Sequence, residues 1–208
     1  MYDNWEELEN SIINCKRCKL CTNRINIVFG QGNKDADVMF IGEGPGADED
    51  MQGIPFVGKA GKLMNMAFEG VGINREDVYI ANIVKCRPPN NRVPENDEAQ
   101  ACLNYLRNQV ILVKPKIIVL LGSTALKNTL GNENSITASR GKWIEKKGIF
   151  YMPTWHPAAL LRDENKKIEF WKDLALVTEL LKDIKEKWLI QSFICQKINN
   201  YMEEIWIT

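Results

Sequence analysis

Four short, continuous apolar runs constrain the fold of this chain more than any other feature of its sequence. A run without polar alternation is typical of a strand that is buried on both faces of a sheet. The runs lie at about residues 36–42, 78–84, 116–122 and 149–155. Because helical patterns separate them, they predict an α/β protein with three α/β/α layers around a central four-stranded parallel sheet.

Helical periodicity marks the segments between and around these runs. Pro94 and Pro115 delimit the clearest one, and Ser123 is the predicted N-cap of another. The predicted helices cover about residues 4–14, 62–70, 96–113, 123–130 and 164–187.

The bulk composition indicates a single packed domain over residues 1–208. The chain has 45% hydrophobic residues and a formal net charge of zero, so neither disorder nor a globally basic nucleic-acid binder is indicated. It contains no apolar run of the roughly 18 residues that span a membrane, and its acidic N-terminus lacks the apolar region of a signal peptide. We therefore expect a monomeric cytoplasmic protein without a membrane partner.

The last residues, 188–208, form a separate feature. Isoleucines recur at helical spacing from Ile190 to Ile205, which predicts a C-terminal helical extension. We expect this helix to pack on the domain, and a self-association surface is the alternative.

Six of the fourteen glycines lie between Gly42 and Gly61, directly after the first apolar run. The block contains a G-x-G-x-x-A pattern and a near match to a P-loop. However, Glu43 and its acidic neighbours would repel a phosphate, Pro45 lacks an amide donor, and Ala60 lacks the hydroxyl that binds magnesium. A dinucleotide or nucleotide triphosphate site is therefore disfavoured, and Phe56 could instead present its face to a flat ligand. Core packing is the alternative for this ring.

Three motifs in a fixed order carry a family resemblance. They are the glycine-rich block 42–61, Val84-Lys85-Cys86-Arg87-Pro88-Pro89-Asn90-Asn91-Arg92, and Trp155-His156-Pro157-Ala158-Ala159-Leu160-Leu161-Arg162. Together with the cysteine spacing, they make the chain resemble the family 4 uracil-DNA glycosylases, which are iron–sulfur enzymes, over about residues 8–182. The resemblance implies a DNA-repair hydrolase that flips uracil out of DNA and cleaves its N-glycosidic bond.

Matched residue by residue, the resemblance implies a pocket for one flipped base. Phe56 would stack on the base and Asn82 would read its edge, since a side-chain amide can donate to uracil O4 and accept from N3–H. His156, which is the only histidine of the chain, would stabilise the negative charge that develops at uracil O2.

The group that orients the attacking water is not apparent. Gly44 stands where the best-known uracil-DNA glycosylases have an aspartate. Glu43, Glu49 and Asn91 remain as candidates, and the resemblance alternatively places Glu49 near uracil C5, where it would exclude the methyl group of thymine. A solvated loop is the alternative for the acidic residues.

Residues around the motifs are candidates for contact with DNA. An exposed leucine after the His-Pro turn, Leu160 or Leu161, could fill the gap left by the flipped base, unless it is buried at a helix start. Several basic residues would contact phosphates, or else be solvated charges. They are Lys85, Arg87, Arg92, Arg140, Lys142 and Arg162.

The cysteines predict a metal centre. Cys15, Cys18, Cys86 and Cys102 match the family's four ligands of a [4Fe–4S] cluster, whereas residue chemistry alone leaves tetrahedral zinc equally open. Cys21 is interpreted as a non-ligand.

Other functions remain in competition. A non-catalytic iron–sulfur or zinc DNA-binding protein is one alternative. A second is a superfamily member that bonds covalently to the abasic sugar, although such proteins carry a histidine-containing loop before the fourth cysteine that this chain lacks. A P-loop nucleotide hydrolase is the third.

Overall fold

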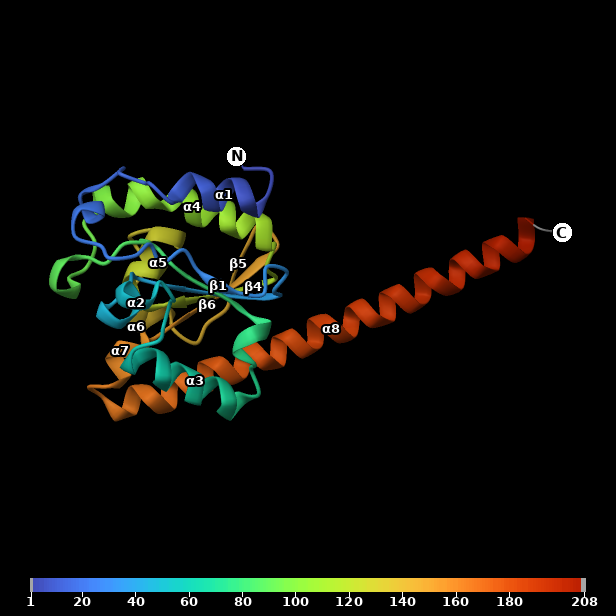
Figure 1. The fold of residues 1–208 in the computed structure, drawn as a ribbon. Helices are drawn as coiled ribbons and strands as arrows, with labels where there is room; N and C mark the ends of the chain where they lie inside the picture. Colours follow the sequence, from blue (N-terminus) through green and yellow to red (C-terminus); the bar gives the residue numbers. More distant parts are fainter. Residues whose placement is uncertain (1, 207–208) are drawn as a thin grey trace.

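A computed structural model describes residues 2–206 of the chain, including the side chains of residues 2–187. The strands are β1 (Gln31–Gly32), β2 (Val38–Gly42), β3 (Tyr79–Asn82), β4 (Ile117–Leu121), β5 (Ile144–Lys146) and β6 (Ile149–Thr154). They form one sheet with the order β1-β3-β2-β4-β6-β5 (Figure 1). The inner four strands are parallel, and β1 and β5 pair antiparallel at the two edges.

The predicted α/β class is confirmed, but the sheet has six strands rather than four. Each apolar run forms one of the parallel strands. The two additional strands are short, and their side chains are exposed or half-buried, so no apolar pattern marks them in the sequence.

Helices cover both faces of the sheet. They are α1 (Trp5–Ile12), α2 (Ala47–Gln52), α3 (Lys59–Val71), α4 (Asn96–Val113), α5 (Gly122–Leu130), α6 (Ile136–Ser139), α7 (Pro157–Leu160) and α8 (Glu164–Trp206), with the 3-10 turns η1 (Lys19–Thr22), η2 (Arg75–Asp77) and η3 (Pro89–Asn91). Figure 1 shows α1, α4 and α5 on one face of the sheet and α3, α7 and the first part of α8 on the other, which gives the predicted three layers.

The core follows from the pleat of the strands, because neighbouring side chains point to opposite faces. In β2, Met39 and Ile41 pack with the α1 and α4 layer, whereas Val38 and Phe40 pack with the α3 and α8 layer. All four are almost fully buried. Burying each such side chain stabilises the fold by about 1.5–3 kcal/mol, which explains why the runs are apolar throughout.

The helix boundaries agree with local signals in most places. Helix α4 starts after Glu95, where a capping box with Glu98 satisfies free backbone amides, and it ends at Lys114 in the left-handed conformation with φ of 54°. The prediction that Ser123 caps α5 is wrong, because the helix already begins at Gly122 without a capping side chain.

Helix α8 continues as one element to Trp206, and its C-terminal part extends beyond the layers in Figure 1. The side chains from residue 188 onward lie outside the described residues. The expected packing of this extension on the domain therefore stays a prediction. Within the described part of the chain, no helix is both long and apolar enough to cross a membrane.

Candidate active site at the carboxyl ends of the strands

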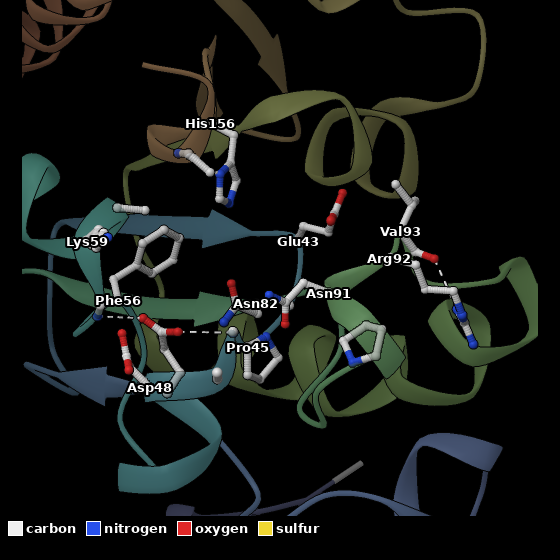
Figure 2. Close-up of a pocket in the computed structure, with 18 of the residues that line it drawn as sticks. Glu43, Pro45, Asp48, Phe56, Lys59, Asn82, Asn91, Arg92, Val93 and His156 are labelled. Carbon is white, nitrogen blue, oxygen red and sulfur yellow. Dashed lines mark hydrogen bonds between the residues drawn. The ribbon is translucent and has the colours of Figure 1, made fainter. Parts of the chain in front are cut away.

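A cavity of about 590 Å³ lies at the carboxyl ends of the parallel strands, where ligands of open α/β sheets bind. The register of β2 and β3 places Gly42 beside Asn82, and His156 follows the end of β6 (Figure 2). Nine of the predicted site residues line the cavity: Glu43, Gly44, Glu49, Phe56, Asn82, Asn91, Arg92, His156 and Arg162.

Phe56 forms one wall of the cavity. Its φ of 52° is unusual for a residue other than glycine, and such strain persists only where the surroundings enforce it. Gly42 and Gly61 make room for it, since a Cβ on Gly42 would lie 2.6 Å from the ring and one on Gly61 would overlap the Phe56 backbone. The ring centre lies 5.7 Å from that of His156. The glycine block therefore makes room for the Phe56 ring, which is 5% exposed and packs with the α3 and α8 layer while it also lines the cavity.

Glu49 holds this loop in shape. Its Oε1 accepts hydrogen bonds from the amides of Val57 and Gly58 at 2.9 and 2.8 Å, and its Oε2 accepts one from Gly46 at 3.0 Å. Both carboxylate oxygens are thus bound to the backbone on the two sides of the loop. This arrangement points to the organisation of the Phe56 loop rather than to the activation of water.

Two buried polar atoms lack a partner, and both belong to this cavity. They are Oδ1 of Asn82 and Nε2 of His156, the only such side-chain atoms among residues whose side chains the structure describes. Buried polar groups are almost always satisfied, because an unsatisfied one costs about 1–3 kcal/mol. A ligand that donates to Asn82 and accepts from His156 would remove this cost.

The protonation state of His156 follows from its contacts. Its Nδ1 accepts a hydrogen bond from the amide of Ala158 at 3.2 Å, so in the neutral ring the proton resides on Nε2. Burial lowers the pKa of the imidazole to about 4. At neutral pH the ring is therefore an uncharged donor whose Nε2–H is available to a ligand in the cavity.

Glu43 lies across the cavity from Phe56 (Figure 2). Its Oε2 accepts a short hydrogen bond from the hydroxyl of Thr124 in α5. Burial raises the pKa of the Glu43 carboxyl, and the bond from Thr124 acts in the opposite direction. Asn91, on the same side of the cavity, accepts a hydrogen bond from Arg87 Nε at 2.8 Å.

A model of the uracil DNA glycosylase superfamily matches residues 29–175. The chain belongs to the uracil DNA glycosylase superfamily. Two relatives are the Type-4 uracil-DNA glycosylases of Sulfurisphaera tokodaii, 46% identical over 86% of this chain and 85% of the relative, and of Thermotoga maritima, 45% identical over 78% and 86%. A Type-5 uracil-DNA glycosylase of Pyrobaculum aerophilum is 27% identical over 75% and 83%. The resemblance to the family 4 enzymes is thereby confirmed.

Within this member of the superfamily, packing explains the glycine at position 44. A Cβ on Gly44 would lie 2.7 Å from Cγ2 of Val84, which is fully buried. An aspartate could not be placed here without moving Val84. The packing of Val84, just after β3, therefore leaves no room for a carboxylate side chain at position 44.

Several of the basic residues that flank the motifs, and that were candidates for phosphate contact, are engaged within the protein. The prediction for Lys85 is wrong, because its side chain is fully buried and donates to Gln109 at 2.6 Å. Arg140 is bound to Asp173, and Arg92 binds both oxygens of Glu98 at 2.8 Å. The structure gives Arg140 and Arg92 structural ion pairs, although Arg92 also lines the cavity.

Arg87, Lys142 and Arg162 form no ion pair among the residues whose side chains are described, and their contact with phosphates stays a prediction. Arg87 is half-buried beside Asn91, and Lys142 is exposed. Arg162 is exposed and, unlike the other two, lines the cavity.

The two leucines after the His-Pro turn differ in environment. Leu160 is fully buried with the α3 and α8 layer, whereas Leu161 is 51% exposed. The predicted contact with DNA is therefore corrected for Leu160, which is a core residue, and Leu161 alone retains the possibility of entering the base stack.

The four cysteines predicted as ligands meet at one small hollow together with Cys21. Cys15, Cys18, Cys21, Cys86 and Cys102 all line it, and all are free thiols. Arg24 joins two of the three contributing segments, since its Nη1 donates to the Cys15 carbonyl at 2.8 Å and to the Cys86 sulfur at 3.3 Å. Among the described residues, no set of three or more Cys, His, Asp or Glu side chains is positioned to hold a metal ion.

Sequence reasoning missed Thr124, Asp48 and Lys59. Thr124 contacts Glu43, and the other two line the cavity. A signal for Thr124 was present, because it follows the carboxyl end of β4, at the same edge of the sheet as the rest of the site. Asp48 and Lys59 had no signal beyond their place in the glycine-rich block.

Proposed function

We propose that this protein releases uracil from DNA by hydrolysing the N-glycosidic bond, which leaves an abasic site. The observation that carries the proposal is the pair of unpartnered buried atoms, Asn82 Oδ1 and His156 Nε2, next to the Phe56 ring. Membership of the uracil DNA glycosylase superfamily and the names of the Type-4 relatives support it.

Uracil satisfies both atoms at once. Its N3–H can donate to Asn82 Oδ1 while its O4 accepts from the amide nitrogen, and its O2 can accept from His156 Nε2–H. Cytosine has an acceptor at N3 and a donor amino group at C4. The Asn82 oxygen would then face another acceptor and the Asn82 amide nitrogen another donor, so neither hydrogen bond could form. Sites that hydrogen-bond a substrate in this way reject the analogue strongly, since their buried groups would remain unpaired.

The geometry also suits the departure of the base. When the bond between C1′ and N1 breaks, its electron pair stays on uracil and negative charge develops at O2. The neutral, buried donor at His156 would stabilise that charge, and a preorganised donor of this kind contributes about 2.7–4 kcal/mol. A water molecule held close to C1′ then adds to the sugar cation.

We propose further that Cys15, Cys18, Cys86 and Cys102 hold a [4Fe–4S] cluster, with zinc as the alternative. What supports the proposal is that these four thiols, from the N-terminal segment, the loop after β3 and helix α4, line one hollow. When bound, the cluster would supply a structural crosslink between the N-terminal segment and the loop after β3. That loop carries Asn91 and Arg92, which line the base cavity.

A uracil-release assay tests the function. The protein should cleave a uracil-containing oligonucleotide after alkali treatment and leave a thymine control intact. Asn82→Ala and His156→Ala should each reduce turnover by about 100-fold or more, which is the loss found when one oxyanion-hole donor is removed. DNA affinity should be largely retained. The exposed Asn104→Ala on α4 serves as the matched control.

The assay separates this function from its alternatives. A wild-type protein that binds but does not cleave uracil DNA would favour a non-catalytic binding module. A protein that remains attached to the abasic strand after denaturation would favour the crosslinking class.

A spectroscopic experiment tests the cluster. Purified protein should absorb broadly near ~400 nm and contain iron, and Cys86→Ser should lose both signals whereas Cys21→Ser keeps them. A colourless protein that contains zinc would contradict the assignment. Light scattering on the same preparation tests our proposal that the protein is a monomer. We further propose that the enzyme works in the cytoplasm.

A further inference from the structure

The three candidates for orienting the attacking water have different environments. Both carboxylate oxygens of Glu49 accept backbone hydrogen bonds in the Phe56 loop. Asn91 accepts a hydrogen bond from Arg87 and is exposed. Glu43 is the remaining carboxylate, and it combines burial with a place in the cavity wall.

One contact fixes the Glu43 carboxylate. Thr124 Oγ1 donates to Oε2 of Glu43, and no other hydrogen-bond partner contacts this carboxylate in the part of the chain whose side chains are described. Oε1 is thereby left for a molecule in the cavity.

Thr124 is well suited to hold a group in place, because it sits in the first turn of α5. The backbone of this turn also supports His156: at Gly122, with φ of 85°, a Cβ would lie only 2.9 Å from the His156 Cβ. Farther along the helix, Asn128 donates to the Thr124 carbonyl at 2.9 Å. The start of α5 therefore positions both the donor for the leaving base and the carboxylate opposite it.

We propose that Thr124 is a positioning residue that aims Glu43 at the attacking water and keeps its carboxylate ionised. The proposal rests on the uracil-releasing function above. The C1′–N1 bond breaks and its electron pair leaves on uracil. The C1′–O bond forms from water, and the proton released by that water passes to Glu43 Oε1. The uracil anion takes its proton from solvent, so the reaction needs no co-reactant.

Burial and the hydrogen bond from Thr124 are the two influences on the pKa of the Glu43 carboxyl. Titratable groups from the other elements face the same cavity, namely Asp48, Glu49, Lys59, Arg92, His156 and Arg162. Burial raises the pKa of the Glu43 carboxyl, and the Thr124 hydroxyl lowers it. Removing that hydroxyl therefore raises the pKa further.

The test compares Thr124→Val with Thr124→Ser. We expect the valine variant to lose roughly tenfold in kcat with KM unchanged, as for one hydrogen bond to a charged group. The acid limb of its pH–rate profile should move to higher pH. The serine variant keeps the hydroxyl and should restore both the rate and the limb. Thr178→Val on α8, whose hydroxyl bonds only its own helix backbone, is the matched control.

A double-variant cycle shows whether Thr124 acts through Glu43. Glu43→Gln should lose most of the turnover, and adding Thr124→Val should cost little more. Additive losses, or a valine variant with the wild-type rate and limb, would overturn the proposal. A Thr124→Val protein that melts early but keeps the wild-type limb would overturn it too, since that is a purely structural role. A wild type without uracil release would instead refute the underlying function.

Discussion

His156 shows how a single residue can be prepared for its task by its surroundings. Burial lowers its pKa to about 4, against about 6.5 for a histidine in an unfolded chain. The ring is therefore neutral across the pH range in which a DNA repair enzyme works, and no activity limb between pH 5 and 8 should belong to it. Under the proposal for Thr124, an acid limb of the activity would belong to Glu43 instead.

The same shift predicts a pH-dependent stability. As the pH falls from about 6.5 toward 4, the unfolded chain binds a proton at His156 and the folded chain does not, so stability is lost over this window. His156→Gln cannot titrate, and the loss of stability in wild type relative to this variant should reach at most about 3 kcal/mol. Urea unfolding at pH 7 and pH 4 measures it. Equal losses in both proteins would show that His156 titrates normally.

At the scale of elements, the loop between α2 and α3 depends on Glu49. Glu49→Gln replaces an acceptor oxygen with a donor amide that faces backbone N–H groups, so we expect a destabilisation of about 1–3 kcal/mol. KM should rise because Phe56 is no longer held. Thermal unfolding and steady-state kinetics measure both effects, with the exposed Glu69→Gln on α3 as the control. A fall in kcat at unchanged melting temperature would instead indicate a direct role in the reaction.

The elements also show what sequence can predict. Long apolar runs bounded by breakers give the parallel strands, and flanking prolines give α4 at its observed limits. Helix α2 was not predicted, because it lies among glycines and acidic residues that carry no apolar helical pattern. The edge strands β1 and β5 were not predicted either, because strands of two and three partly exposed residues carry no apolar pattern.

The candidate site was predictable for a different reason. His156 lies in one of the ordered motifs and Asn82 lies two residues before another, and the parallel topology then brings both strand ends to one edge of the sheet. By contrast, an arginine or lysine near a motif looks the same in sequence whether it faces a phosphate or a partner such as Asp173. The ion pair of Arg140 and the burial of Lys85 depend on the tertiary packing, so sequence could not show them.

At the scale of the whole molecule, the core can be compared with the C-terminal extension. Among the residues whose side chains are described, all that line the cavity precede α8, and the fully buried apolar side chains of α8 are Phe170, Leu174 and Val177. These three lie well before residue 188. The first part of α8 therefore belongs to the core, and we predict that residues 188–208 can be removed without loss of the fold.

A truncation tests this division. A protein ending at Lys187 keeps all three core side chains, so we expect its melting temperature to fall by less than about 4 °C and its uracil release to match the full chain. Ending the chain at Asp163 removes those contacts and should abolish folding, since each large core side chain contributes several kcal/mol. Light scattering on the full chain and the 1–187 protein then decides between the two uses of the extension. A dimeric full chain with a monomeric, equally active truncation would assign residues 188–208 to self-association, whereas lost stability in the 1–187 protein would show that they pack on the domain.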